Sequence, residues 1–477
     1  MSLSPLIAIC GTTGVGKSKL AVDLALKLYQ GSHPHGWHGA RVINADSMQV
    51  YKGMDIITNK IPVSERQGIE HVLMGFKDPM EQYVVGEWVR DAMSEVAKAH
   101  ERKQIPIIVG GTSYWIQHLI FPDRLATDPD HPTRTPDSTP SEGLAASLAQ
   151  LPPELLHLFH ALPSIPPTAS EDPERAFSLY ALLSALDPVV ASRWHWRDTR
   201  KVLRNLVIMK DQGRRPSEIL TEQSQRSARP RYRTLCFWLY AKPEVLNSRL
   251  DARVDDMISQ GLLEEIRNLH QISVEVPASS ASLQTSDGIK DEGQKPDYTL
   301  GIYQSIGYKE FHTYLKEPVP SDQAFTIAVE AMKLSTRKYA KRQVSWLRNK
   351  LLPEVHAANE LVDTRDVVVY LLDATELGDK WGSEVCDNAA SLTQDFLDNK
   401  PLPEPTSFSE SAKTMLSVTS KPKDPTAVLQ ARRKTICTAC TVNELQPVMI
   451  DESDRRAHER TRDHRRMVSK ARKLLLQ

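Results

Sequence analysis

Gly11-Thr12-Thr13-Gly14-Val15-Gly16-Lys17-Ser18 matches the G-x-x-x-x-G-K-S pattern of a phosphate-binding loop. The apolar run Leu6–Cys10 before it is typical of a buried parallel strand. After it, apolar residues recur at helical spacing, at Leu20, Ala21, Leu24, Ala25 and Leu28. The motif therefore lies between a strand and a helix, which is the context that it requires, and it predicts a site for a diphosphate or triphosphate.

The residue types of this loop explain why it suits phosphate. Glycines let the backbone surround the anion, and the start of the helix adds positive potential. Lys17 adds a full charge, and the Ser18 hydroxyl can hold Mg²⁺. The structural alternative is a glycine-rich turn between a strand and a helix. The motif does not distinguish ATP from another diphosphate compound.

Length and composition bound the class of protein. A chain of 477 residues allows about two to four domains. Lysine plus arginine and aspartate plus glutamate both number 60, which excludes a uniformly basic nucleic-acid binder but not a local basic patch. Five cysteines argue against a disulfide framework and for a reducing compartment.

Location and assembly are expectations from the same data. No apolar run reaches the ~18 residues of a membrane helix, so we expect no membrane partner. The first predicted strand begins a few residues after Met1, so we expect no removable targeting peptide. We expect a monomeric, cytoplasmic protein, and the sequence leaves a mitochondrial or nuclear pool open.

An acidic residue follows the second predicted strand. Residues 41–46 are predicted as a second buried strand that ends in Asp46, with Ser47, Met48 and Gln49 after it. Ligands of open α/β sheets bind at the carboxyl ends of the strands, so Asp46 should lie at the same edge as the phosphate loop. It could hold Mg²⁺, act as a general base, or cap a helix, and spacing alone leaves these three roles open.

The strand Ile105–Val109 ends in Gly110-Gly111-Thr112, where an ordinary nucleoside triphosphatase would carry an acid. The glycine pair indicates a close approach of the backbone to another group, and Thr112 offers a hydroxyl there. A glycine turn with a capping threonine is the alternative.

Residues 122–173 are rich in Pro, Ser, Thr and Asp, which predicts an extended or partly disordered insertion. The helical region that follows carries Arg200, Lys201 and Arg204 about one turn apart on one face. A solvated face is the default interpretation, and an anionic partner is the functional one.

The second half of the core is expected over residues 216–350. It contains a strand at Thr234–Tyr240, a helix with Arg249 and Arg253 on one face, and a flexible insertion at 273–297. A helix over 322–350 ends in a segment, 337–350, that has six basic and no acidic residues. Tyr339 and Trp346 are interleaved with them, a composition typical of a helix that faces nucleic acid.

The C-terminal tail has a candidate metal site. Residues 351–430 are predicted as a linker, and residues 431–477 contain 12 Lys/Arg against 6 Asp/Glu. Cys437, Cys440, His458 and His464 are a plausible tetrahedral zinc set. The alternative is an accidental cysteine pair in a basic tail.

Taken together, these motifs resemble those of the tRNA dimethylallyltransferases (tRNA isopentenyltransferases), in the eukaryotic form with a C-terminal zinc finger. The matching runs, in the family's order, are 11–18, 46–60, 106–119, 187–206, 249–265, 301–310 and 336–350. The resemblance implies an α/β fold: a phosphate-loop core with a parallel sheet, an inserted helical domain and a C-terminal zinc finger. We expect five segments, namely 1–121, 122–215, 216–350, 351–430 and 431–477.

The resemblance also implies a reaction. Dimethylallyl diphosphate donates its prenyl group to the exocyclic amine of the adenosine 3′ of the anticodon, position 37 of tRNA, after that base is flipped out of its stack. By residue matching, Asp46 is the base and Thr112 orients the amine. The phosphate loop, Mg²⁺ and Arg253 hold the diphosphate. Residues expected to contact tRNA are Ser47, Met48, Gln49, Arg200, Lys201 and Arg204, and Zn²⁺ is structural.

Two other functions compete with this one. A phosphate-loop kinase of a nucleoside or small metabolite would require a nucleoside triphosphate, and the Gly110–Thr112 turn counts against it. A non-catalytic zinc-finger RNA-binding protein would not need the intact set Lys17, Ser18, Asp46 and Thr112.

Overall fold

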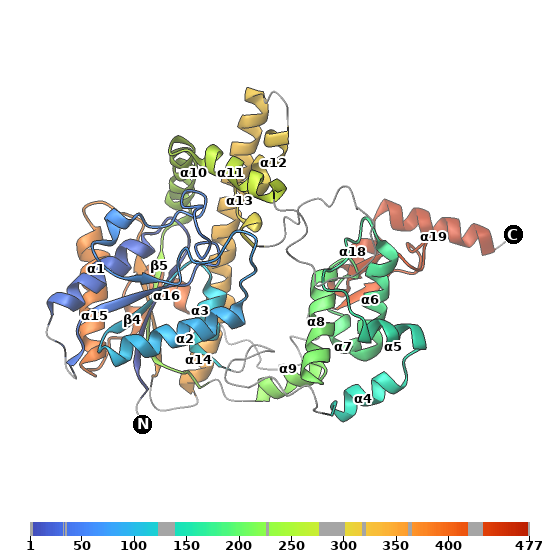
Figure 1. Ribbon diagram of the computed structural model, residues 1–477, viewed down its shortest axis with the longest axis horizontal. Helices are drawn as coiled ribbons and strands as arrows, with labels where there is room; N and C mark the ends of the chain where they lie inside the picture. The colour runs from blue at the N-terminus through green and yellow to red at the C-terminus, as the bar shows by residue number, and fades with distance from the viewer. Residues whose placement is uncertain are drawn as a thin grey trace. The chain divides into compact units, whose positions relative to one another are not determined.

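The computed structural model describes residues 3–31, 33, 36–122, 139–225, 229–275, 301–316, 321–360, 365–417 and 433–475. The chain forms two compact units (Figure 1). The first comprises Met1–Pro122 and Ala228–Ser420, and the second comprises Asp123–Ser227 and Lys421–Gln477. The second unit is thus built from an insertion in the middle of the chain and from the C-terminal tail.

A six-stranded sheet forms the centre of the first unit, with the order β3-β2-β4-β1-β5-β6 and every pair parallel. Its strands are β1 (Pro5–Gly11), β2 (Ala40–Asn44), β3 (His71–Val72), β4 (Ile105–Val109), β5 (Arg233–Tyr240) and β6 (Val367–Asp373). β2 and β4 are buried along their whole length, as expected for parallel strands covered on both faces. The predicted parallel α/β core is confirmed.

Ten α-helices of the described residues belong to the first unit: α1 (Lys17–Gln30), α2 (Val85–Glu101), α3 (Ser113–Ile120), α10 (Pro243–Ser259), α11 (Leu262–Glu275), α12 (Tyr308–Lys316), α13 (Asp322–Trp346), α14 (Leu352–Glu360), α15 (Asn388–Leu397) and α16 (Glu410–Leu416). α1 buries Leu20, Leu24 and Leu28 in the core. This is the face that the helical spacing after the phosphate loop predicts. The predicted helix at 322–350 is α13, which continues as a π-helical turn, Leu347–Leu351.

The structure corrects the predicted linker at 351–430. Its run Val367–Leu372 is the edge strand β6, paired with β5 from Thr234↔Val367 to Tyr240↔Asp373. α15 packs beside α1 (Figure 1), and Lys27 Nζ lies 2.7 Å from Asp387 Oδ1. Trp381 contacts the phosphate loop, because a Cβ added to Gly16 would lie 2.7 Å from its ring. The prolines and serines that lie further along the segment, mainly after residue 400, obscured this apolar run in the composition.

The second unit is a helical bundle with a small hairpin. It contains α4 (Glu142–Ala149), α5 (Pro153–His160), α6 (Pro173–Leu186), α7 (Pro188–Ala191), α8 (Thr199–Gln212), α9 (Pro216–Gln225), β7 (Lys434–Ile436), β8 (Met449–Asp451), α18 (Arg455–Glu459) and α19 (Arg462–Leu475). α9 therefore belongs here and not to the 216–350 part of the core. The predicted insertion at 122–173 holds α4 and α5, and its residues 123–138 lie outside the described part, as does the predicted 273–297 insertion from residue 276 onward.

The tail is folded into this bundle and is not a separate domain at 431–477. Met449 of β8 joins the core cluster that contains Leu183, Trp196 and Leu206. The Trp196 Nε1–H donates to Pro447 O at 2.8 Å, and the Lys434 N–H donates to Ser192 O at 2.6 Å. Within the described ranges, no helix combines the length and apolar character needed to cross a membrane.

We expect Gly11→Ala to destabilise the first unit. Gly11 has φ 139°, and an added Cβ would lie 2.3 Å from Leu239 O on the neighbouring strand β5. Overpacking plus an unfavourable backbone conformation should reduce the free energy of unfolding by roughly 2–4 kcal/mol. Urea denaturation measures this. Gly378→Ala is the matched control, because no atom lies within 4 Å of its added Cβ, and an equal loss in both variants would contradict the packing argument.

Candidate active site

Three turns meet at the carboxyl edge of the sheet because β2, β4 and β1 are neighbours. The phosphate loop follows β1, Gly110–Thr112 follows β4, and Asp46 follows β2 by two residues. The Ala45 N–H donates to Val109 O at 2.7 Å, and the Thr112 N–H donates to Ala45 O at 3.1 Å. The edge that the strand pattern predicted therefore brings these turns together.

The phosphate loop has the backbone that its glycines allow. Gly14 and Gly16 have φ 79° and 85°, in the left-handed region, and α1 begins at Lys17. Lys17 Nζ donates to Thr12 O at 2.6 Å, and Arg249 Nη1 on α10 donates to Gly14 O at 3.1 Å. The buried Thr12 Oγ1 has no hydrogen-bond partner among the described residues, so it is available to a ligand.

Two cations are held away from water at this edge. Desolvation lowers the pKa of Lys17 from 10.5 to about 8, with Asp46 opposing the change and Arg253 adding to it. Desolvation likewise lowers the pKa of Arg253 from 12.5 to about 10, again opposed by Asp46. Two cations thus share one carboxylate, and a bound anion would stabilise both charges.

Asp46 does not cap a helix, because residues 47–50 after it form bends and turns. Its Oδ1 accepts from the Met48 N–H at 3.0 Å, and its own N–H donates to Asn44 Oδ1 at 3.1 Å. A Cβ added to Gly111 would lie 3.1 Å from Asp46 Oδ2, so the second glycine of the pair allows this carboxylate to approach the turn.

Thr112 lies beside Asp46 and is hydrogen-bonded to Ser47, the residue that follows Asp46. Its Oγ1 accepts from the Ser47 N–H at 3.0 Å and donates to Ser47 Oγ at 3.2 Å. The capping alternative is not observed, because the Thr112 side chain makes no capping bond to α3. The turn therefore presents a carboxylate and a hydroxyl next to the desolvated cations.

α13 contributes two residues that the sequence interpretation missed in this role. The Tyr339 hydroxyl lies next to Thr112 and Gln343, and burial, with a smaller contribution from Asp46, raises the pKa of Tyr339. Gln343 hydrogen-bonds to both Thr13 and Gly111. Tyr339 was assigned to a surface facing nucleic acid. The available signal was the i, i+4 spacing of Tyr339 and Gln343, which places them on one face of the helix.

The other predicted site residues divide between the two units. Ser47, Met48 and Gln49 are partly exposed in the first unit, where Gln49 Nε2 donates to Thr58 O and Asn59 O, both at 3.1 Å. Arg200, Lys201 and Arg204 are exposed on α8 of the second unit. Lys201 Nζ lies 2.7 Å from Asp198 Oδ2 and 4.7 Å from the centre of the Trp194 ring.

Cys437, Cys440, His458 and His464 form a cluster that could hold a metal ion, with all four ligand atoms within 4.8 Å of one another. Cys437 Sγ and Cys440 Sγ each lie 3.4 Å from His464 Nδ1, and Cys440 Sγ lies 3.4 Å from His458 Nε2. Two thiols and two imidazoles at such distances fit a closed tetrahedral site. All five cysteines are free of disulfides.

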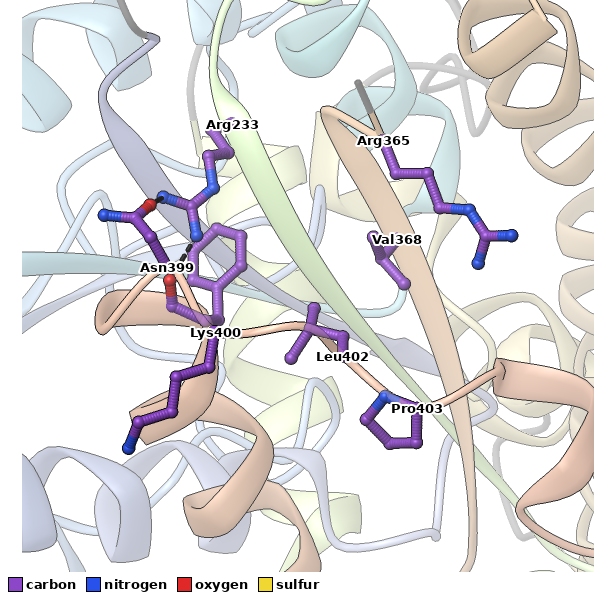
Figure 2. Close-up of a pocket in the computed structure, with 8 residues that line it drawn as sticks. Arg233, Arg365, Val368, Asn399, Lys400, Leu402 and Pro403 are labelled. Carbon is purple, nitrogen blue, oxygen red and sulfur yellow. Dashed lines mark hydrogen bonds between the residues drawn. The ribbon is translucent and has the colours of Figure 1, made fainter. Parts of the chain in front are cut away.

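A separate cavity of about 240 Å³ opens at the opposite, amino edge of the sheet (Figure 2). Its cations are paired within the protein. Arg233 bonds with Asn399 and with Phe396 O, Arg365 lies 2.8 Å from Glu404, and Lys400 lies 2.7 Å from Asp398. These pairs hold β5, β6 and the segment after α15 together, which favours a structural role for the cations that line this cavity.

Comparisons with known proteins agree on one family. The family model described as IPP transferase matches residues 49–350. The tRNA dimethylallyltransferase of Schizosaccharomyces pombe is 35% identical over 98% of this chain and 95% of its own length. The enzyme of the same name from Homo sapiens is 32% identical over 84% of this chain and 76% of its own length.

A solved structure is similar over the whole chain. It is a eukaryotic dimethylallyltransferase described as acting on tRNA, with a TM-score of 0.71, 30% identity, and coverage of 99% of this chain and 98% of that one. The family match spans more than half of the chain, and the match to the Schizosaccharomyces pombe enzyme spans nearly all of it. The chain belongs to the IPP transferase family.

Proposed function

We propose that this protein transfers the dimethylallyl group of dimethylallyl diphosphate to the exocyclic amine of the adenosine at position 37 of tRNA, 3′ of the anticodon. The observation that carries the proposal is the pairing, at one sheet edge, of a diphosphate-type loop with a carboxylate and a hydroxyl. Lys17 and Arg253 supply the positive charge for the diphosphate, and Asp46 and Thr112 supply the carboxylate and the hydroxyl for the amine. The printed names of the relatives support the same transfer.

The proposed step balances as a substitution at the allylic carbon. The amine nitrogen forms a bond to that carbon, the carbon–oxygen bond to diphosphate breaks, and the amine proton passes to Asp46. Thr112 orients the amine through its hydroxyl. The leaving diphosphate gains negative charge, which Lys17, Arg253 and the loop amides stabilise. Mg²⁺, bound with the diphosphate at the Ser18 hydroxyl, would add further charge neutralisation.

The kinase alternative is less well supported by the same geometry. A kinase places an acid near its Mg²⁺, whereas β4 ends in two glycines and a threonine. Asp46 instead lies next to the Gly111 turn. Incubation with unmodified tRNA, Mg²⁺ and labelled dimethylallyl diphosphate in the absence of ATP separates the two functions, because only the prenyl transferase would label tRNA.

The second unit is proposed to bind tRNA. Arg200, Lys201 and Arg204 are exposed on one helix and suit phosphate contacts. Zn²⁺ at Cys437, Cys440, His458 and His464 would be structural, because four ligands leave no open position for a catalytic water. The monomeric state and the cytoplasmic location, with or without a mitochondrial or nuclear pool, stay predictions from the sequence.

Asp46→Asn should lower the single-turnover rate of prenyl transfer by about 10²–10⁴-fold, because the amide keeps the shape but cannot accept the proton. Affinities for tRNA and for Mg²⁺-pyrophosphate should change little. The control is Asp78→Asn, an exposed carboxylate paired with Lys52. A near-normal rate in the Asp46 variant would remove Asp46 from the base role.

Binding of Mg²⁺-pyrophosphate should weaken as the pH rises through about 8. Lys17 has its pKa lowered to about 8, so it is charged below that value and neutral above it, and only the charged form attracts the diphosphate. Calorimetric titration between pH 6.5 and 9.5 measures the dependence. Lys17→Arg should move the loss of affinity to a higher pH, and an unchanged profile in that variant would assign the titration to another group.

The wild-type protein should contain about one zinc per chain, and a Cys437→Ser, Cys440→Ser double variant should lose it. Because Pro447 and Met449 pack in the helical bundle, loss of the metal should also weaken tRNA binding through the second unit. The rate at saturating tRNA should fall much less. Cys386→Ser, a free buried cysteine of the first unit, is the control, and zinc retained in the double variant would overturn the assignment.

A further inference from the structure

Gln343 connects two turns of the candidate active site through the two ends of its side-chain amide. Its Oε1 accepts a hydrogen bond from the Thr13 N–H at 3.0 Å. Its Nε2 donates to Gly111 O at 2.9 Å. The residue is only 5% exposed. One buried side chain therefore spans from the phosphate loop to the turn that carries Thr112.

The two partners fix the orientation of this amide. A backbone N–H can only donate and a carbonyl can only accept. If the amide were reversed, its NH₂ group would face the Thr13 N–H and its oxygen would face the Gly111 carbonyl, so neither hydrogen bond could form. A buried polar group without a partner is costly, so the amide is held in one orientation. The Thr13 N–H is consequently paired within the protein, and the later amides of the phosphate loop remain for the diphosphate.

Gly111 is the point at which Gln343 and Asp46 come closest. A Cβ added there would lie 2.7 Å from Gln343 Nε2 and 3.1 Å from Asp46 Oδ2. With a side chain at this position, the Gln343 amide would have to move and the Asp46 carboxylate would have to shift slightly. The proposed base and the Gln343 amide are thus both positioned against the same glycine.

α13 is attached to its neighbours on both sides of Gln343. Before it, Lys333 Nζ lies 2.8 Å from Asp255 Oδ1 on α10, the helix that also carries Arg253. After it, the Trp346 Nε1–H donates to Gln117 Oε1 on α3 at 3.0 Å. These contacts fix α13 along its axis, so Gln343 can act as a spacer of constant length.

Tyr339 extends the same connection by one helical turn. Its hydroxyl lies next to the side chains of Thr112 and Gln343, and burial keeps it a neutral phenol by raising its pKa. The face of α13 that holds Tyr339 and Gln343 therefore contacts the phosphate loop, the Gly111 turn and Thr112.

We infer that Gln343 is a positioning residue of the proposed prenyl transfer. It fixes the distance between the phosphate loop, which binds the donor, and the Asp46–Thr112 pair, which binds the acceptor amine. Tyr339 supports it by holding Thr112. The inference rests on the proposed function. A positioning role can be distinguished from a purely structural one. It predicts a slower chemical step and weaker diphosphate binding, while the affinity for tRNA stays unchanged.

Gln343→Met tests the bridge, because methionine has a similar length and no amide. At saturating substrates its single-turnover rate should fall by about 10–100-fold, the order of loss that a misplacement near 1 Å produces. The dissociation constant for Mg²⁺-pyrophosphate should rise several-fold, and that for tRNA should stay within about twofold. The thermal unfolding midpoint of each variant is measured in parallel.

Two further variants act as tests of mechanism. Gln343→Glu keeps the acceptor for Thr13 but can donate to Gly111 O only when protonated. Its rate relative to the wild type should therefore recover as the pH falls from 8 to 6. Tyr339→Phe should lower the rate less than Gln343→Met, and the double variant should lose less than the product of the single losses because both act on one turn.

The control is Thr336→Val on the same helix, whose hydroxyl bonds only to Met332 O of its own helix, at 2.9 Å. It should keep a rate within about twofold of the wild type. A near-normal rate in Gln343→Met, an equal loss in Thr336→Val, or a ratio for Gln343→Glu that does not vary with pH would each overturn the inference. Absence of transfer by the wild-type protein would instead refute the proposed function, and the pyrophosphate titration would still test the bridge to the phosphate loop.

Discussion

Close packing against three glycines, by backbone at Gly11 and Gly110 and by side chains at Gly111, is the constraint on which the site depends. A Cβ on Gly11 would lie 2.3 Å from Leu239 O, and a Cβ on Gly110 would lie 2.2 Å from Ala45 O. A Cβ on Gly111 would meet both Gln343 and Asp46. Because β2, β4 and β1 are adjacent parallel strands, the turns after them can come this close only where side chains are absent. The glycines thus determine how near the phosphate loop, Asp46 and Thr112 can lie to one another.

Electrostatics follows from that proximity. Desolvation lowers the pKa of both Lys17 and Arg253, and the nearby carboxylate of Asp46 opposes the shift only in part. An isolated pair of such cations would be unfavourable, and a diphosphate is an anion of the right charge to offset them. In the proposed reaction, these two cations would meet the charge that develops on the leaving diphosphate with little reorganisation when the bond breaks.

The sequence predicted the parts of this site that follow a strand or a strong motif. The phosphate loop, Asp46 and Thr112 each come at the end of a short apolar run, so the parallel sheet places them at one edge. Gln343 could not be found in this way, because its role depends on where α13 packs, and packing between distant helices leaves no local pattern. The edge strand β6 was missed for a different reason: the prolines, serines and mixed charge of the residues that follow it, 375–430, dominated the composition of the predicted linker.

The organisation of the second unit links its metal site to its basic face. Trp196 is fully buried, donates to Pro447 O, and shares a core with Met449 from the tail. It lies just before α8 (Thr199–Gln212), the helix that carries Arg200, Lys201 and Arg204. A metal ion that orders the hairpin between Cys437 and His464 would therefore also order the beginning of α8. The four ligands and the three basic residues belong to one folding unit, so a metal would affect the proposed RNA binding even without any contact of its own with RNA.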